Sequence, residues 1–250
     1  MRILLTNDDG YSKEGIRALD AAFSAAGHEV WVASPSSNRS AQSHSLCLDR
    51  PITFTRYGEK RYHCSGSPTD CILYSLKADL FGAMPDLVVS GINHGYNCSS
   101  DILYSGTCSA ASEAVLQGVR ALAVSAEKAA DGSYGFDDVA SFVATNLDRL
   151  YSLTSLRSFV NLNFPPHFEP VVDVCTLGQL WYGDVPEVVS HEGDVLTLSL
   201  KSGEVSRNGA RDGSLTDIEA CEMGHIALSV VLVNPAVDDQ AHSRARELFS

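Results

Sequence analysis

Residues 1–33 read MRILLTNDDGYSKEGIRALDAAFSAAGHEVWVA and contain the signals of a strand, a helix and a second strand, in that order. Arg2–Leu5 is a short, mostly apolar run typical of a buried strand, and Glu29–Ala33 is a second one. Between them, apolar residues recur at helical spacing over Ile16–Ala26, and Gly27 marks the end of the predicted helix. This order favours a βαβ unit, which belongs to a parallel sheet.

The alternation of strands and helices continues to about residue 165. We therefore predict an α/β fold with a parallel-sheet core for residues 1–165. The further predicted strands are Leu87–Val89, Ala121–Ser125 and Phe159–Leu162, and the further predicted helices are Ser109–Leu116 and Asp137–Leu150.

The pattern changes after Pro165. Leu196, Leu198 and Leu200 alternate with polar residues, which is the period-two pattern of a strand with one exposed face. We predict that residues 166–250 form a strand-rich C-terminal extension of the core.

The C-terminal extension also bears on assembly. Strands beyond a doubly wound core need a surface to pair with, and the run Ile226–Val233 is apolar enough to pair. The tail after Pro235 is polar and can reach a neighbouring subunit. We expect a homodimer or a homotetramer, because closed two-fold assemblies are the commonest outcome.

The net charge narrows the choice of partner. The 250-residue chain has 31 acidic and 18 basic residues, which gives a net charge of −13. Such a surface repels nucleic-acid phosphates, so binding to a nucleic-acid duplex is excluded as the main function. An acidic protein that handles a phosphate group needs local help from a metal ion or from oriented backbone N–H groups.

The N-terminal sequence, the apolar runs and the cysteines bear on where in the cell the protein is found. Met1 and Arg2 lead directly into the first strand, so we expect no signal peptide. The apolar runs fall far short of the ~20 residues of a membrane helix, so we expect no membrane contact. The seven cysteines form no C-x-x-C motif, which favours reduced thiols in the cytoplasm and argues against a zinc site.

Oxygen-rich loops follow three of the predicted strands. They are Asn7–Gly10 (NDDG), Ser34–Ser40 and Ser90–Asn97. Ligands of open α/β sheets bind beyond the carboxyl ends of the strands, and hard cations such as Mg²⁺ prefer oxygen ligands. A dication beside Asp8 and Asp9 makes these adjacent carboxylates compatible. The alternative is an ordinary turn, since each residue of NDDG favours turns.

A fourth stretch, Ser105-Gly106-Thr107, immediately precedes a predicted helix. The N–H groups at a helix start are unpaired and favour an anion, and Gly106 allows an oxyanion to approach closely. The alternative is that Ser105 or Thr107 only caps the helix. Both interpretations are compatible.

Three single residues have two interpretations each. His94 can contact a phosphate or act as an acid, whereas a lone loop histidine is more often solvated. Arg39 can form a bidentate contact with a phosphate group or a surface ion pair. Cys108 is close to the predicted anion site, where a buried structural thiol is favoured over a nucleophile. The chain contains no G-x-S-x-G, Walker or G-x-G-x-x-G motif after its first strand.

The motifs LLTNDDG, NRS, GSPTDC, SGINHGYN and YSGT-x-x-A-A occur in this order over residues 1–126. Together they resemble the stationary-phase survival protein SurE family of metal-dependent nucleotidases. The resemblance continues weakly through VNLN at residues 160–163 and through Thr216-Asp217 to His225. It implies a Rossmann-like α/β core with a strand-rich C-terminal part used in dimerisation.

The resemblance also implies a set of site residues. One divalent cation per subunit, Mg²⁺ or Mn²⁺, would be held by four residues, and a phosphate cradle would lie next to it. The chain departs from the family at residues 13–15, which read KEG instead of Ala-Pro-Gly, and its loop after the second strand is one residue longer. The implied metal ligands are Asp8, Asp9, Ser40 and Asn93, and the implied phosphate-binding residues are Asn97, Ser105, Gly106 and Thr107.

The resemblance implies that the chain removes phosphate from nucleoside 5′- and 3′-monophosphates. Asp8, Asp9 and Asn97 are the predicted catalytic residues, with Asp8 or Asp9 accepting a proton from the attacking water. Attack by an aspartate carboxylate stays open as a second route. The competing functions are a broad acid phosphatase or exopolyphosphatase, and a non-catalytic nucleotide-binding protein.

Overall fold

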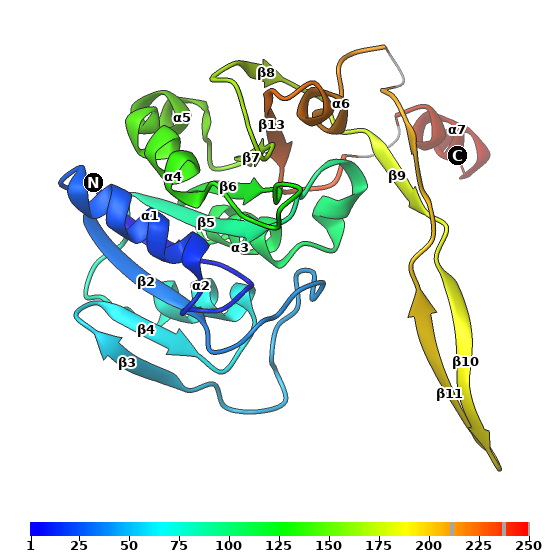
Figure 1. Cartoon of the computed structure of the whole chain (residues 1–250), viewed down its shortest axis with the longest axis horizontal. Coiled ribbons are helices and arrows are strands. Elements are labelled where there is room, and N and C mark those ends of the chain that lie inside the picture. The colour runs from blue at the N-terminus through cyan, green and yellow to red at the C-terminus, as the bar shows by residue number, and fades with distance from the viewer. Residues whose placement is uncertain (211–212, 237–238, 250) are drawn as a thin grey trace.

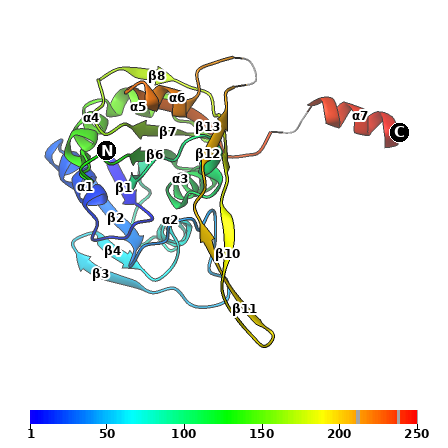
Figure 2. The same cartoon turned by 45° about the vertical axis from the view of Figure 1, so that its right-hand side comes forward.

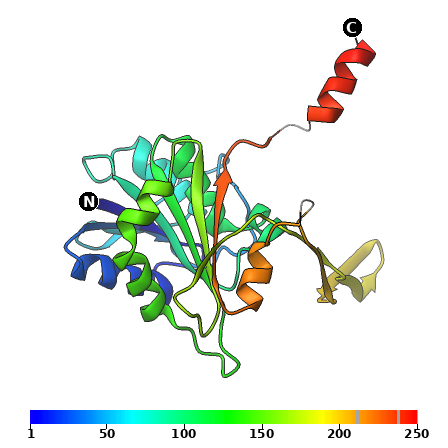
Figure 3. The ribbon, with the colours of Figure 1, turned by 90° about the horizontal axis from the view of Figure 1, so that it is seen from above.

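The computed structural model describes residues 1–210, 213–236 and 239–249. A nine-stranded sheet crosses the molecule and carries helices on both faces (Figures 1 and 3). Its strand order is β3-β4-β2-β1-β5-β6-β7-β13-β8. The bounds are β1 Arg2–Thr6, β2 Glu29–Pro35, β3 Phe54–Gly58, β4 Arg61–Cys64, β5 Leu87–His94, β6 Arg120–Ala126, β7 Ser158–Phe164, β8 Val172–Val174 and β13 Ile226–Leu232.

The central strands are parallel, as the sequence predicts. β1 pairs in parallel with β2 and with β5, and β5, β6 and β7 follow in parallel. Ile3, Leu4 and Leu5 of β1 are fully buried, because helices cover both faces of a parallel sheet and leave its strands apolar on both sides. The α/β fold with a parallel-dominated sheet is confirmed.

Each face of the sheet has its own helices and its own core. On one face, Leu19 of α1 and Val139 of α4 pack in one apolar cluster with Leu5. On the other face, Ile72 of α2 and Ala111 of α3 pack in a second cluster. The helix bounds are α1 Glu14–Ala25, α2 Pro68–Lys77, α3 Gly106–Leu116, α4 Phe136–Thr145 and α5 Leu147–Leu153.

The predicted helix Asp137–Leu150 is wrong in one respect, because the chain forms two helices there. α4 and α5 meet at Asn146, which has φ −100° and ψ 14°. Its side-chain amide donates to Phe142 O at 3.0 Å. The Asn146 side chain thus satisfies a carbonyl group at the end of α4 and favours the break.

The C-terminal extension contributes to the main sheet. β13 lies between β7 and β8, antiparallel to β7 and parallel to β8. The apolar run that we expected to pair with a partner therefore pairs inside this chain. The sheet crosses the predicted boundary at residue 165, and the division into regions 1–165 and 166–250 stays a prediction.

A long hairpin extends away from the sheet (Figures 1 and 2). It consists of β10, Val185–Glu192, and β11, Val195–Lys201, which pair antiparallel. All seven residues of β11 are exposed, so the prediction that one face of this strand is buried is wrong within this chain. The reason is the projection of the hairpin, which leaves both faces without cover from the described residues.

Short elements connect the hairpin to the core. β9 and β12 pair antiparallel, and β9 contacts the 3₁₀ helix η1. α6 packs against β13, while α7 lies apart from the sheet (Figure 2). Within the described residues, no helix is long and apolar enough to span a membrane. The bounds are η1 Ser99–Leu103, β9 Gln179–Tyr182, β12 Val205–Asn208, α6 Asp217–Glu222 and α7 Asp239–Phe249.

Candidate functional site

Asn7 closes the turn that follows β1. Its side-chain amide donates to Gly10 O at 3.0 Å, and Gly10 N donates to Asn7 Oδ1 at 3.2 Å. Ser34 Oγ at the end of β2 also donates to Asn7 Oδ1. The stretch NDDG is therefore a turn, but the turn uses Asn7 and leaves the carboxylates of Asp8 and Asp9 for other contacts.

The Asp8 carboxylate lies at the N-terminus of α3. Asp8 is 3% exposed, and its Oδ1 accepts from Thr107 Oγ1 at 2.6 Å. A Cβ on Gly106 would lie 2.8 Å from Asp8 Cβ, so only glycine permits this approach. Burial raises the pKa of Asp8 from 3.8 to about 6, against the lowering effect of Thr107 and with a further rise from Asp9.

The Asp9 carboxylate contacts the third loop. Its Oδ2 accepts from His94 N at 3.2 Å and lies 2.7 Å from His94 Nδ1. The His94 ring packs edge-on against Tyr134 and Phe136, at centroid distances of 4.9 and 4.8 Å. His94 is therefore a fixed partner of Asp9, and the interpretation as a solvated loop histidine is wrong.

Asn93 and Ser40 have more local contacts. The Asn93 side-chain amide donates to Gly95 O at 2.9 Å. Ser40 is exposed and donates from Oγ to Asn38 Oδ1 at 2.6 Å. Its loop nevertheless touches the site, because Arg39 N donates to Asp8 O at 2.7 Å.

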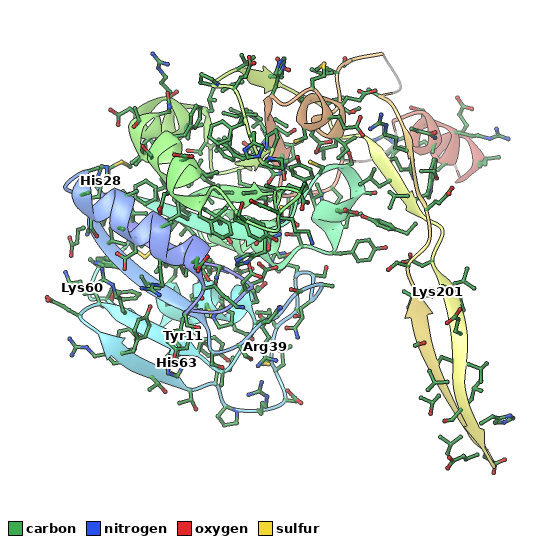
Figure 4. The ribbon with its side chains drawn as sticks, viewed as in Figure 1. Tyr11, His28, Arg39, Lys60, His63 and Lys201 are labelled. Carbon is green, nitrogen blue, oxygen red and sulfur yellow. The ribbon has the colours of Figure 1, made fainter. Side chains whose placement is uncertain are left out.

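The Arg39 side chain forms neither of the two expected contacts. Its Nη2 donates to Ser65 O at 3.2 Å, and its Nε is buried without a partner within the described residues. Nearby, Tyr11 stacks on His63 with 4.7 Å between ring centroids, below α1 in Figure 4. The loops after β1 and β2 are thus held at the edge of the sheet by packing as well as by hydrogen bonds.

Asn97 is the centre of a buried amide network that the sequence patterns did not indicate. Its Nδ2 donates to Ser125 Oγ at 2.8 Å, and its N donates to Asn163 Oδ1 at 2.8 Å. The side-chain amide of Asn161 donates to Asn97 O at 2.8 Å. Asn161 and Asn163 alternate with apolar residues on the fully buried strand β7. Because buried amide side chains need hydrogen-bond partners, two asparagines in an apolar strand are a sequence signal for such a network.

Ser105 caps α3, as the alternative interpretation predicts. Its hydroxyl accepts from Cys108 N at 3.0 Å. Cys108 is 2% exposed, and burial raises the pKa of its thiol to about 12. A thiol with this pKa stays protonated, so Cys108 is a structural residue and not a nucleophile.

The donor set fits a hard cation. Two adjacent carboxylates are buried here, and burial together with Asp9 disfavours the charged form of Asp8, which a dication would reverse. Within the described residues, no group of three or more His, Cys, Asp and Glu side chains is arranged to hold a metal. A cation would therefore depend on amide and hydroxyl oxygens in addition to the carboxylates, as Mg²⁺ does more readily than zinc.

The fold and the site together define a Rossmann-like α/β protein with an acidic, oxygen-rich centre at the carboxyl ends of β1 and β5. The chain belongs to the family described as Survival protein SurE, whose sequence model matches residues 3–184. The match ends just before β10 begins.

Named relatives and a solved structure agree with this membership. A protein of Treponema pallidum (strain Nichols), named 5′-nucleotidase SurE, is 45% identical over 167 residues, which are 65% of this chain and 89% of that protein. A protein of Erythrobacter litoralis (strain HTCC2594) with the same name is 39% identical over 168 residues, which are 66% of this chain and 67% of that protein. The crystal structure of the SurE protein from Aquifex aeolicus has a TM-score of 0.82 and 26% identity, with full coverage of both chains.

Proposed function

We propose that this chain is a divalent-metal-dependent phosphomonoesterase that hydrolyses nucleoside 5′- and 3′-monophosphates to nucleoside and phosphate. The names of its relatives, 5′-nucleotidase SurE, support this activity. The observation that carries it is the Asp8 carboxylate, buried against the N-terminus of α3 and adjacent to Asp9.

One Mg²⁺ or Mn²⁺ per subunit would be held by the side chains of Asp8, Asp9, Asn93 and Ser40. When bound, the cation supplies Lewis-acid polarisation of a phosphoryl oxygen. Thr107 fixes the orientation of Asp8, and His94 fixes that of Asp9. Within the described part of the chain, the hydrogen bonds of the Asp9 carboxylate all involve Oδ2, which leaves Oδ1 for the cation. Asp8 or Asp9 would accept the proton of an attacking water.

The N-terminus of α3 orients the phosphate of the substrate. Backbone N–H groups at Gly106 and Thr107 favour the negative charge that shifts between oxygens in the transition state. Gly106 lets the Asp8 carboxylate lie close to the helix start, and Ser105 holds that start in place through its cap. Asn97 is held by Ser125 and by the amides of β7, which keeps the loop before α3 rigid.

The proposal includes a homodimer or homotetramer in the cytoplasm. Exposed apolar side chains on the projecting hairpin, among them Val188, Leu196 and Leu198, support an assembly. All seven cysteines are unpaired, which supports a reducing compartment. Light scattering at micromolar concentration tests the assembly, and a monomer there would refute it.

The test of activity is phosphate release from a set of nucleoside monophosphates with Mg²⁺, Mn²⁺ or EDTA. Release from AMP and GMP with metal supports the proposal. Binding of AMP without phosphate release would indicate the non-catalytic alternative. Preferred hydrolysis of polyphosphate would indicate the exopolyphosphatase.

A further inference from the structure

A cavity of about 510 Å³ lies between the loop that follows β5 and the elements β9, β12 and α6. Its volume is within the range of small-molecule sites, about 300–1,000 Å³. Gly95 and Tyr96 form its wall on the side of the proposed metal ligand Asn93.

The cavity shares its loop with the proposed catalytic site. Asn97 lies in the chain between two residues that line the cavity, and Asn93 holds Gly95 O through its side-chain amide. A Cβ on Gly95 would have one atom within 4 Å, Glu127 Oε2 at 3.9 Å. The space beside Gly95 is therefore open, and Glu127 Oε2 is the atom of the described residues that lies near it.

Hydrogen bonds join β9 and α6, which form one wall of the cavity, to η1, the 3₁₀ helix that follows this loop. Ser100 Oγ donates to Leu180 O at 3.1 Å and accepts from Leu180 N at 3.0 Å. Asp217 is fully buried, and its carboxylate accepts from Ser99 N and Ser99 Oγ, both at 2.6 Å. Charged acceptors make strong hydrogen bonds, so the cavity is a rigid feature of the fold.

One part of the lining is apolar and aromatic. Leu180, Val205 and Ile218 line the cavity together with the rings of Tyr96 and Tyr182. Tyr182 also donates a hydrogen bond to Asp101, which fixes its ring. Surfaces of this kind suit a flat heterocycle, which can pack against apolar side chains and aromatic faces.

The charged part of the lining is mainly negative. Asp101, Glu127 and Glu222 face Arg207, which is paired with Glu222. Glu127 Oε1 accepts from Lys128 N at 2.9 Å, and its Oε2 has no hydrogen bond within the described residues. Such a lining repels a second phosphate group and favours neutral groups that donate hydrogen bonds, such as amino and hydroxyl groups.

We propose that this cavity binds the nucleoside part of the substrate, with the base on the apolar wall and a ribose hydroxyl donating to Glu127 Oε2. The inference rests on the proposed nucleotidase function and adds the element of recognition. This gives β9, β12 and α6 a role in nucleoside binding. The negative lining of the cavity then favours monophosphates over nucleotides with longer phosphate chains.

A larger cavity of about 610 Å³ lies between α4 and residues 165–168. It shares only Glu127 with the cavity described above and contains no residue of the loop 93–97. A nucleoside bound there would be separated from the phosphate site, so the smaller cavity is the better candidate.

The first test places a larger side chain at an exposed position in the cavity lining. Val205 is 55% exposed, so Val205→Trp adds bulk without a buried clash, and Val174→Trp at a 77% exposed position outside the cavity is the matched control. We expect Val205→Trp to raise the KM for AMP about tenfold with little change in kcat, because it removes uniform binding. Hydrolysis of p-nitrophenyl phosphate, which has no nucleoside, stays unchanged in both variants.

The second test addresses the ribose. We expect wild-type protein to have a higher kcat/KM for AMP than for 2′,3′-dideoxy-AMP. Glu127→Gln keeps the size of the side chain and should reduce the ratio of these two values about tenfold. An unchanged preference refutes the role of Glu127. Equal losses on AMP and on p-nitrophenyl phosphate in Val205→Trp, or no loss on AMP, refute the cavity as the nucleoside site.

A binding measurement separates this inference from the proposed activity. AMP is titrated calorimetrically into wild type and Val205→Trp in EDTA, where no turnover occurs. Weaker binding to the variant supports the cavity even if wild type releases no phosphate, an outcome that would reject the nucleotidase function alone. Equal binding to both proteins overturns the inference while leaving hydrolysis of small phosphomonoesters intact.

Discussion

Replacement of Asp8 by asparagine should stabilise the metal-free protein and strongly reduce the stabilisation that metal provides. Folding raises the pKa of Asp8 from 3.8 to about 6, so above pH 6 the folded protein holds a charge that burial disfavours. A rise of about two pKa units corresponds to roughly 3 kcal/mol. The asparagine side chain avoids this cost and keeps an oxygen for Thr107, although this bond loses its charge, so we expect a net gain of about 1–2 kcal/mol.

The pH dependence follows from the direction of the shift. A carboxyl whose pKa is raised in the folded state favours folding below its unfolded value of 3.8, and this contribution is lost as pH rises through about 6. The advantage of Asp8→Asn is therefore absent near pH 4, grows between pH 4 and 6 and is constant above. Asp194→Asn, at an exposed carboxylate in the turn between β10 and β11, is the control for the loss of one negative charge.

With metal bound, wild type should become more stable than Asp8→Asn, the reverse of their order without metal. At 100 times its dissociation constant, Mn²⁺ stabilises wild type by about 2.7 kcal/mol, and the variant should gain much less. For a chain of this size, 1 kcal/mol shifts the Tm by about 2–4 °C. Phosphate release from AMP should fall by roughly 10²-fold or more. Melting curves at pH 5 and 8, with EDTA or Mn²⁺, measure the shifts; equal metal-induced shifts with activity retained would refute the reasoning.

Three further results are expected. Activity on AMP should stop in EDTA and return with Mg²⁺ or Mn²⁺, because oxygen ligands hold a removable hard cation; full activity in EDTA would contradict this. Asp217→Ala should lower the free energy of unfolding in urea by about 3 kcal/mol, since Ser99 N and Ser99 Oγ lose their buried acceptor, whereas a change under about 1 kcal/mol would show that water replaces it. Gly15→Ala should destabilise the protein by about 1–3 kcal/mol, although alanine favours helices, because the new Cβ would lie 2.2 Å from Ile92 O; a higher Tm in this variant would show that α1 moves freely.

The parallel core could be predicted from sequence because its strands are fully buried and therefore apolar. β1, β2, β5, β6 and β7 all have this character. β4 could not be found in this way, since this strand, Arg61–Cys64, has only four residues and most of them are polar. α2 had a signal that the apolar pattern did not use, the capping box between Ser67 and Asp70.

The site was predicted where its residues are close in the chain and missed where they are distant. Asp8, Asp9 and the start of α3 follow from their own loops. The contact between Asp9 and His94 joins residues 85 positions apart, and the bonds from Asn97 to Asn161 and Asn163 join residues 64 and 66 positions apart. Such pairs depend on strand order, which a single sequence does not fix.

The late position of β13 has a consequence for synthesis on the ribosome. β7 is complete at Phe164, but its neighbour begins at Ile226, so its outer edge stays uncovered while the hairpin and α6 are made. All seven residues of β7 are buried in the finished sheet, and an uncovered strand of this kind pairs readily with other chains. Nascent chains that stall before Ile226 therefore leave the edge of β7 open to pairing with other chains, whereas chains that extend past Leu232 can cover β7 themselves.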